Sequence, residues 1–309
     1  MSRLRVVKIR RSRDTAALGL PDDPVPSAPD ADVAAHVRAA VDRWLRVIVA
    51  REPGVRRGKD IEDLHQMRVA VRRLRAMLRA ARPLLEAPEL EDLRRDLGSV
   101  GRALGPVRDL DVLLARLDEQ AKTLPRAERA AIGALLDDIE SERVAARRRM
   151  TILLDSKRYD RLLHRLARFT PESTSDRSAL LPLVHKQFTK LAKAVEEAGD
   201  DPGDDVLHAL RIRGKRLRYT AELAKPLAGK PMRKLIKAAK AFQDVLGEHQ
   251  DACVAEDRIR ALLAARKRVD IDMAFAAGRL VEREQARRAE SRANWLPAWT
   301  ELAERARAI

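Results

Sequence analysis

Two stretches of the chain carry nearly the same sequence and predict that its fold contains the same helical unit twice. Residues 64–75 read Leu-His-Gln-Met-Arg-Val-Ala-Val-Arg-Arg-Leu-Arg, and residues 207–218 read Leu-His-Ala-Leu-Arg-Ile-Arg-Gly-Lys-Arg-Leu-Arg. A second pair follows at nearly the same offset: residues 104–109 read Leu-Gly-Pro-Val-Arg-Asp, and residues 246–251 read Leu-Gly-Glu-His-Gln-Asp. Motifs that recur together at a constant separation indicate an internal duplication.

The composition favours an all-α fold. Ala, Leu, Arg and Glu dominate the chain, and all four are strong helix formers. Hydrophobic residues make up 45% of the 309 residues, which is enough for a core, although aromatic residues make up only 3%. The formal net charge is +16 at pH 7, and such an excess attracts anionic partners: nucleic acid, anionic lipid or free phosphates.

Cysteine usage and hydropathy predict a cytoplasmic protein. Cys253 is the one cysteine of the sequence, so no intramolecular disulfide can form, as is usual in a reducing cytosol. No apolar run approaches the roughly 18–20 residues that span a bilayer, so we expect no membrane span. The basic N-terminus has no apolar stretch behind it and therefore does not resemble a secretory signal.

The beginning of the chain differs from the rest. Four prolines prevent a helix over residues 19–30, so residues 1–30 are expected to form a tail and a Pro-rich linker. Within the tail, the apolar residues of Leu4–Ile9 suggest a short strand. Residues 31–309 show almost uninterrupted helical periodicity and are expected to form one domain.

Short loops between long amphipathic segments predict two up-and-down four-helix bundles, one for each copy of the repeat. The first bundle covers residues 31–123, with helices at 31–51, 60–86, 88–104 and 108–123. Connecting helices at 125–155 and 157–169 fill residues 125–169. The second bundle covers residues 178–266, with helices at 178–198, 204–225, 231–246 and 248–266. C-terminal helices at 267–290 and 295–307 complete residues 267–307.

The repeated helices carry cations along one face. At about 100° per residue, one stripe of the first copy carries a histidine and four arginines: His65, Arg68, Arg72, Arg75 and Arg79. From Arg68 to Arg82 the sequence has six arginines and no acidic residue, so i,i+4 pairs do not neutralise the row. A rigid row of guanidinium groups suits a repeating phosphate chain, because each group can donate two hydrogen bonds to phosphate oxygens.

The second copy repeats the row with His208, Arg211, Lys215 and Arg218. Arg213 and Arg216 are expected to point elsewhere on this helix. Glu222 shortens the row and is expected to pair with Arg218 and orient it. The hypothesis of a polyanion site requires that both rows face one shared cavity.

The two repeated histidines share the register of the cations, so we expect them to contact the anion. Imidazole titrates near pH 6.5, and nearby arginines lower its pKa whereas a bound phosphate raises it. We therefore expect anion binding to tighten as the pH falls from about 8 to 6. Supporting cations are expected from neighbouring helices: Arg38, Arg95, Arg102, Lys186, Lys190, Lys193, Lys237 and Lys240.

Asp109 and Asp251 follow the Leu-Gly steps, and we expect them to cap helix N-termini, with anchoring of an arginine as the second choice. The sequence has no metal-ligand spacing, phosphate-binding loop or nucleophile motif. We therefore expect no catalytic residue, metal or cofactor, and we interpret Cys253 as a structural thiol.

The two repeated motif pairs resemble the CHAD family, the conserved-histidine α-helical domain, over roughly residues 31–266. The resemblance implies two four-helix bundles around a basic central groove or pore, binding of inorganic polyphosphate, and association with polyphosphate granules. It also implies the residues that contact phosphate: His65, Arg68, Arg72, Arg73, Arg75, His208, Arg211, Lys215, Arg216 and Arg218. Many relatives carry an N-terminal triphosphate-hydrolysing CYTH barrel, and residues 1–30 are too few for one, so hydrolase activity is not expected.

Two other functions stay open at this point. A nucleic-acid-binding protein would share the charge argument, but the scarcity of aromatic residues disfavours stacking on bases. An accessory module could gather substrate for a triphosphatase or another polyphosphate-metabolising enzyme. Competition between polyphosphate and duplex DNA distinguishes a nucleic-acid-binding protein from a polyphosphate-binding one. An assay for phosphate release tests whether an accessory module has enzymatic activity of its own.

Overall fold

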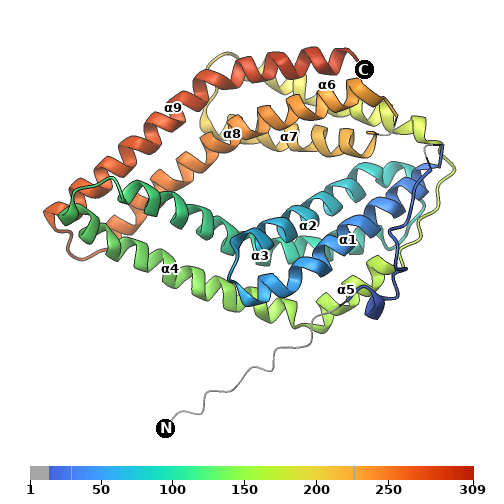
Figure 1. The fold of residues 1–309 in the computed structure, drawn as a ribbon. Coiled ribbons are helices and arrows are strands. Elements are labelled where there is room, and N and C mark those ends of the chain that lie inside the picture. Colours follow the sequence, from blue (N-terminus) through green and yellow to red (C-terminus); the bar gives the residue numbers. More distant parts are fainter. Residues whose placement is uncertain (1–13, 29, 226) are drawn as a thin grey trace, which may run out of the picture.

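The computed structural model describes residues 14–28, 30–225 and 227–309, and Figure 1 shows their arrangement. In these residues nine α-helices and three short 3-10 helices form the fold, and the only β-type pairing is one isolated bridge between Glu86 and Glu172. The all-α prediction is thus confirmed. The suggested strand at Leu4–Ile9 falls outside the described residues.

The helices divide into two halves along the chain. The first half contains α1 (Val33–Arg57), α2 (Ile61–Ala81), α3 (Leu90–Ala121), α4 (Arg126–Leu154) and α5 (Lys157–Ala167). The second half contains α6 (Leu180–Ala198), α7 (Asp204–Leu223), α8 (Gly229–Ala264) and α9 (Ile271–Arg307). The 3-10 helices are η1 (Ala16–Leu18), η2 (Arg82–Leu84) and η3 (Arg177–Ala179). The two repeated motifs at residues 64–75 and 207–218 lie in α2 and α7.

Three predicted helix breaks are wrong. The segments 88–104 and 108–123 form the single helix α3, 231–246 and 248–266 form α8, and 267–290 and 295–307 form α9. Pro106 lies inside α3 and Pro297 inside α9. A proline inside a helix removes one backbone hydrogen bond and crowds the carbonyl four residues earlier as well as the residue before it. Gly105 has no Cβ, which relieves part of this crowding at Pro106.

Because α3 and α8 continue, the predicted four-helix bundles are also corrected. The segments expected to form the fourth helix of each bundle, 108–123 and 248–266, are instead the outer parts of α3 and α8. In the first half, α5 and the end of α4 pack against the core in the position expected for the fourth helix. In the second half, the end of α9 does so. The outer parts of α3, α4, α8 and α9 pack into a second core at the far end of the molecule (Figure 1), built from residues such as Leu117, Ile132, Ile259 and Leu280.

Residues 19–28 of the Pro-rich segment form no helix, as expected, but they lie against α1. Leu18 and Leu20 are buried in the core. Arg46 Nη2 donates to the carbonyl oxygen of Pro21 at 2.7 Å, and the backbone N–H of Val25 donates to Asp42 Oδ2 at 3.1 Å. The segment is therefore part of the folded domain.

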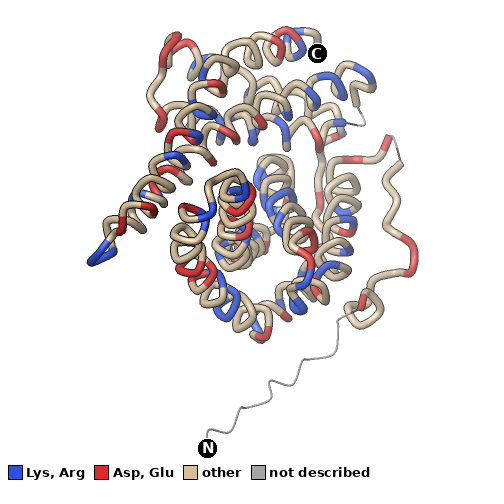
Figure 2. The backbone as a smooth tube through the Cα atoms, turned by 60° about the vertical axis from the view of Figure 1, so that its left-hand side comes forward, with Lys and Arg blue, Asp and Glu red and all other residues tan. Residues whose placement is uncertain are grey.

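Helices α2 and α7 are positioned by their apolar faces. Leu64, Met67, Val71, Leu74 and Leu78 bury one side of α2 at helical spacing, and the cations occupy the side that is left. Helix α7 buries the equivalent positions, including Leu207, Leu210 and Leu217. Figure 2 shows Lys and Arg positions on both sides of the space between the two halves. In the described part of the chain, no helix is both long enough and apolar enough to cross a bilayer.

Candidate functional site

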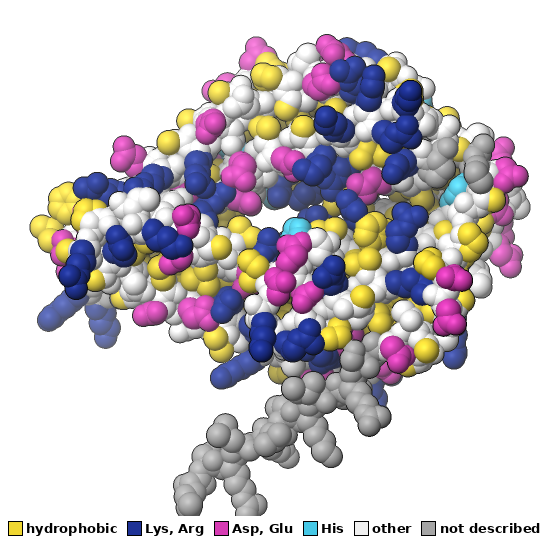
Figure 3. All heavy atoms as spheres, in the orientation of Figure 1, with side chains coloured by type: hydrophobic (Ala, Val, Ile, Leu, Met, Phe, Trp, Pro, Cys, Tyr) yellow, Lys and Arg dark blue, Asp and Glu magenta, His cyan; other side chains and the backbone are white. Residues whose placement is uncertain are grey.

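A cavity of about 640 Å³ lies between the two halves and is bounded by α2, α3, α6 and α7. Figure 3 shows the hollow between the halves with Lys and Arg side chains around it. Of the described residues, ten cationic side chains and no acidic one line the cavity. The ten are Arg68, Arg72, Arg75, Arg79, Arg94, Arg102, Lys186, Lys190, Lys215 and Arg216.

Nine of these ten residues belong to the set predicted from the sequence. Arg216 was expected to point away from the row, yet it lines the cavity together with the cations of α2. Burial is the main cause that lowers the pKa of Arg216, and the charge of Arg79 on α2 is the second. Arg94 was missed. Its guanidinium lies 2.6 Å from Glu91 on the same helix, which is the pattern of an ordinary neutralised surface pair.

Lys215 shows how strongly the two repeated helices face each other. Burial is the main cause that lowers the pKa of its ammonium group to about 7, and the charges of Arg211, Arg72 and Arg68 lower it further. Arg68 and Arg72 lie on α2, whereas Lys215 lies on α7. Cations from both copies of the repeat therefore act on one another across the same space, and an anion placed there relieves the repulsion.

The recurring Leu-Gly and Asp positions hold the first arginine of each row. A Cβ on Gly105 would lie 3.7 Å from Arg68 Nη2, and a Cβ on Gly247 would lie 3.7 Å from Arg211 Nε. Both guanidinium groups thus rest against a glycine of the neighbouring helix. Burial lowers the pKa of each of these arginines, although both stay cationic at neutral pH.

The predicted capping role of the two aspartates is wrong, because both lie inside continuous helices. Asp109 Oδ1 lies 3.3 Å from Arg68 Nη2, which matches the second choice, anchoring of an arginine. Asp251 is mostly buried, which raises the pKa of its carboxyl group, and Arg211 is the largest opposing influence. Arg211 also borders a neighbouring cavity of about 830 Å³ of mixed charge, lined by groups from α7, α8 and α9.

The two histidines lie one turn before the arginines and are not among the residues that line the central cavity. His65 is half-buried, and burial followed by the charge of Arg108 lowers its pKa. His208 Nδ1 forms a hydrogen bond with Gln250 Oε1. Arg108 and Gln250 occupy equivalent positions of the repeat, so the two copies differ in what surrounds their histidines.

Arg73 and Arg218 are not among the residues that line the cavity, and both pair with Glu222: Arg73 from α2 and Arg218 from within α7. Glu222 Oε1 lies 3.4 Å from Arg73 Nη2 and 3.5 Å from Arg218 Nε, which confirms the expected pair of Glu222 with Arg218. Arg73 also lies 4.9 Å from the centroid of the Trp44 ring, and Arg218 lies 5.0 Å from that of Tyr219. These contacts are structural.

The other predicted supporting cations lie away from the cavity. Arg38 donates to the carbonyl oxygen of Ala167 at 2.7 Å and so joins α1 to the end of α5. Arg95, Lys193 and Lys240 pair with acidic residues of their own helices, and Lys237 is exposed on the outside of α8. Their helical spacing is therefore that of a solvated surface.

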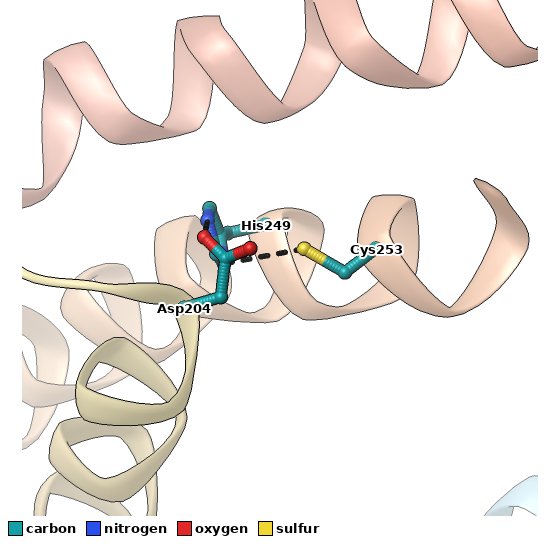
Figure 4. A group of neighbouring side chains, drawn as sticks. All are labelled: Asp204, His249 and Cys253. Carbon is teal, nitrogen blue, oxygen red and sulfur yellow. Dashed lines mark hydrogen bonds and ion pairs between the residues drawn. The ribbon is translucent and has the colours of Figure 1, made fainter. Parts of the chain in front are cut away.

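Asp204, His249 and Cys253 form the one group of described residues whose ligand atoms could surround a metal ion (Figure 4). Asp204 already pairs with Arg288 at 2.5 Å and with Arg292 at 3.0 Å, and a divalent cation would have to displace these guanidinium groups. Burial is the main cause that raises the pKa of the Cys253 thiol to about 11, so it carries no thiolate at neutral pH. The group joins α7, α8 and α9 as a structural cluster.

Comparison with known proteins places this geometry in a family. The model of the CHAD domain matches residues 39–260. Two uncharacterized proteins of Mycobacterium tuberculosis, MT2285 of strain CDC 1551 / Oshkosh and Rv2226 of strain H37Rv, are each 30% identical over 252 residues. The matched region covers 78% of this chain and 47% of each relative, so the chain spans about half the length of the curated relatives that it matches.

Two solved structures share the fold. The crystal structure of the CHAD domain from the plant Ricinus communis aligns with a TM-score of 0.69 and 28% identity, covering 93% of this chain and 96% of that one. PptA from Streptomyces chartreusis aligns with a TM-score of 0.68 and 22% identity, covering 87% and 98%. The likeness to PptA shows the fold alone.

Proposed function

The chain belongs to the CHAD domain family, and we propose that it binds inorganic polyphosphate, without catalysis, in the cavity between its two halves. The observation that carries the proposal is the set of ten cationic side chains, from four helices, that line one cavity in which no acidic residue is among the described lining residues. A solvated basic surface would mix its cations with carboxylates, as the outer faces of this protein do.

The physical argument rests on mutual repulsion. Ten cations around about 640 Å³ repel one another, and the lowered pKa of Lys215 records this repulsion together with burial. A phosphate chain supplies a negative charge at every phosphate and neutralises cations on both walls at once. Arginine groups donate paired hydrogen bonds to phosphate oxygens, and these charge-assisted bonds are the strong ones.

The residues have different roles in this proposal. Arg72 and Lys215 face each other across the cavity and contact the chain from opposite walls. Arg68 and Arg211 rest against Gly105 and Gly247. Arg68 contacts phosphates in the central cavity, and Arg211, which borders the neighbouring cavity, contacts the chain on that side. His65 and His208 lie one turn before these arginines and contact phosphate beside them.

The proposed setting is the cytoplasm, with association to polyphosphate granules. In this setting the chain gathers or holds polyphosphate, and its proposed partner is a polyphosphate-metabolising enzyme. These cellular roles follow from the proposed ligand and rest on the family resemblance.

Titration with long-chain polyphosphate, compared with orthophosphate at equal phosphate concentration, tests the proposal. We expect tight binding to the polymer, weak binding to the monomer, and an affinity that falls steeply with salt as counterions are released. Comparable weak binding to both would refute recognition of a chain. Phosphate release assayed with Mg²⁺ or Mn²⁺ tests the absence of catalysis, and measurable release would refute it.

Nucleic acid is the alternative anion. The cavity lies between packed helices, whereas duplex DNA needs an open surface or an element that enters a groove. We therefore expect duplex DNA to compete poorly with polyphosphate at equal phosphate concentration. Displacement of polyphosphate by an equal amount of duplex would favour nucleic-acid binding.

A further inference from the structure

The central cavity has an apolar side that an inorganic phosphate chain does not use. Seven apolar side chains line the cavity together with the cations, and they come from α2, the 3-10 helix η2, α3, α6 and α7. They are Val71, Ala76, Ala80, Pro83, Leu97, Leu183 and Ile212. Phosphate oxygens gain nothing from such groups, because every contact with them replaces a contact with water.

The apolar groups come from both walls of the cavity. Ile212 of α7 is 38% exposed although it is a large hydrophobic residue, and Leu183 of α6, also in the second half of the molecule, is half-buried. On the first half, Val71 of α2 and Leu97 of α3 line the cavity, together with Gly98 and Gly101 of α3. The cavity therefore has aliphatic groups on both walls in addition to its cations.

Two planar guanidinium groups lie over Gly98 of α3. A Cβ on Gly98 would meet the guanidinium carbon of Arg75 at 3.4 Å and Arg102 Nη1 at 3.5 Å, so both guanidinium groups pass close over the glycine. Guanidinium planes stack on aromatic rings as well as binding phosphate. An aromatic ring in the cavity would contact these guanidinium groups and aliphatic side chains such as Ile212.

We infer that the cavity also accepts phosphate chains that carry an aromatic group, so that its ligands include nucleoside polyphosphates. This inference rests on the proposed function, because the phosphates would use the same cations near Arg72 and Lys215. The cavity volume of about 640 Å³ lies within the range of roughly 300–1,000 Å³ that is usual for small-molecule sites. Mixed apolar and charged walls are typical of sites for such amphipathic ligands.

Equilibrium titration of the full chain with ATP and with inorganic tripolyphosphate, both in EDTA, tests the inference. We expect ATP to bind at least as tightly as tripolyphosphate, although it carries less negative charge. The variant Ile212→Ala should weaken ATP binding roughly tenfold, through loss of apolar contact, and leave tripolyphosphate binding unchanged. The matched control is Ile271→Ala, since Ile271 is 73% exposed at the far end of the molecule and should affect neither ligand.

The outcomes separate this inference from the proposed function. If tripolyphosphate binds but ATP binds far more weakly, and Ile212→Ala changes neither, the apolar side does not contact ligand and the inference is wrong while polyphosphate binding stands. If neither ligand binds, or if the double variant Arg72→Glu and Lys215→Glu binds both as the parent does, the proposed function itself falls. Loss of both ligands in that double variant, with a roughly tenfold weakening of ATP binding alone in Ile212→Ala, supports both proposals.

Discussion

Arg73 Nη2 on α2 and Glu222 Oε1 on α7 lie 3.4 Å apart, so an ion pair joins the two repeated helices. Arg218 Nε approaches the same carboxylate at 3.5 Å, and the Arg73 guanidinium lies over the ring of Trp44. The Arg73–Glu222 pair fixes α2 against α7, and none of these residues lines the cavity. Arg72 and Lys215 are thereby held on opposite walls of the same space.

The variant Glu222→Gln tests this junction. We expect the free energy of unfolding to fall by about 1 kcal/mol, because half-buried Arg73 and buried Arg218 lose their shared partner. Urea denaturation measures the change. Glu301→Gln is the control, since exposed Glu301 pairs with Arg305 of its own helix and its loss should cost less than about 0.5 kcal/mol. Equal losses in both variants would show that the junction adds no stability.

Charge reversal at Arg72 and Lys215 tests the cavity walls. The double variant Arg72→Glu and Lys215→Glu should lower polyphosphate affinity by roughly 100-fold or more, because each site exchanges an attraction for a repulsion. Titration calorimetry measures the affinity, and circular dichroism checks that helicity is kept. Reversal of two outer cations, Lys237→Glu and Lys240→Glu, changes the net charge equally and should weaken binding only slightly. Equal losses in the two double variants would mean that net charge alone attracts the polymer.

The pH dependence of binding follows from Lys215. Its pKa is lowered to about 7 in the free protein, and bound phosphate favours the protonated form. Binding therefore takes up protons near neutral pH, so affinity should rise as the pH falls from about 8 to 6. His65, whose pKa is also lowered, adds to the rise at the acid end. Affinity measured across this range should vary less in Lys215→Arg, since arginine keeps its charge; an unchanged slope would assign the effect to other groups.

The glycine beside Arg211 offers a test of positioning. A leucine at Gly247 would occupy the space that the Arg211 guanidinium now fills, so Gly247→Leu should weaken polyphosphate binding by roughly tenfold. The control is Gly278→Leu in α9, where a Cβ would meet nothing within 4 Å. Binding by both variants is measured after their helicity is matched. Full affinity in Gly247→Leu would show that Arg211 does not need this contact.

The row of cations could be predicted from the sequence because helical spacing fixes which residues share a face. The spacing of Arg68, Arg72, Arg75 and Arg79 places them on one face of α2, and all four line the cavity. Spacing alone could not separate Arg216, which lines the cavity, from Arg218, which pairs with Glu222. That choice depends on how α7 crosses α2, which is a tertiary relationship.

The continuity of the long helices could not be predicted from local signals. A Gly-Pro step usually ends a helix, yet α3 passes through Gly105 and Pro106 because the packing of its outer half against α4, α8 and α9 outweighs one lost hydrogen bond. The same continuity explains the aspartates. Asp109 and Asp251 resemble caps only if a helix begins before them, and in unbroken helices they are left to face Arg68 and Arg211.

A crystal structure of the protein with a short inorganic polyphosphate tests the central claim most directly. The claim is that the cations of both repeated helices bind one phosphate chain in their shared cavity. It predicts phosphate density between α2 and α7, within hydrogen-bonding distance of both Arg72 and Lys215. Phosphates found only on outer cations such as Lys193 and Lys237, with the space between Arg72 and Lys215 filled by water, would contradict it.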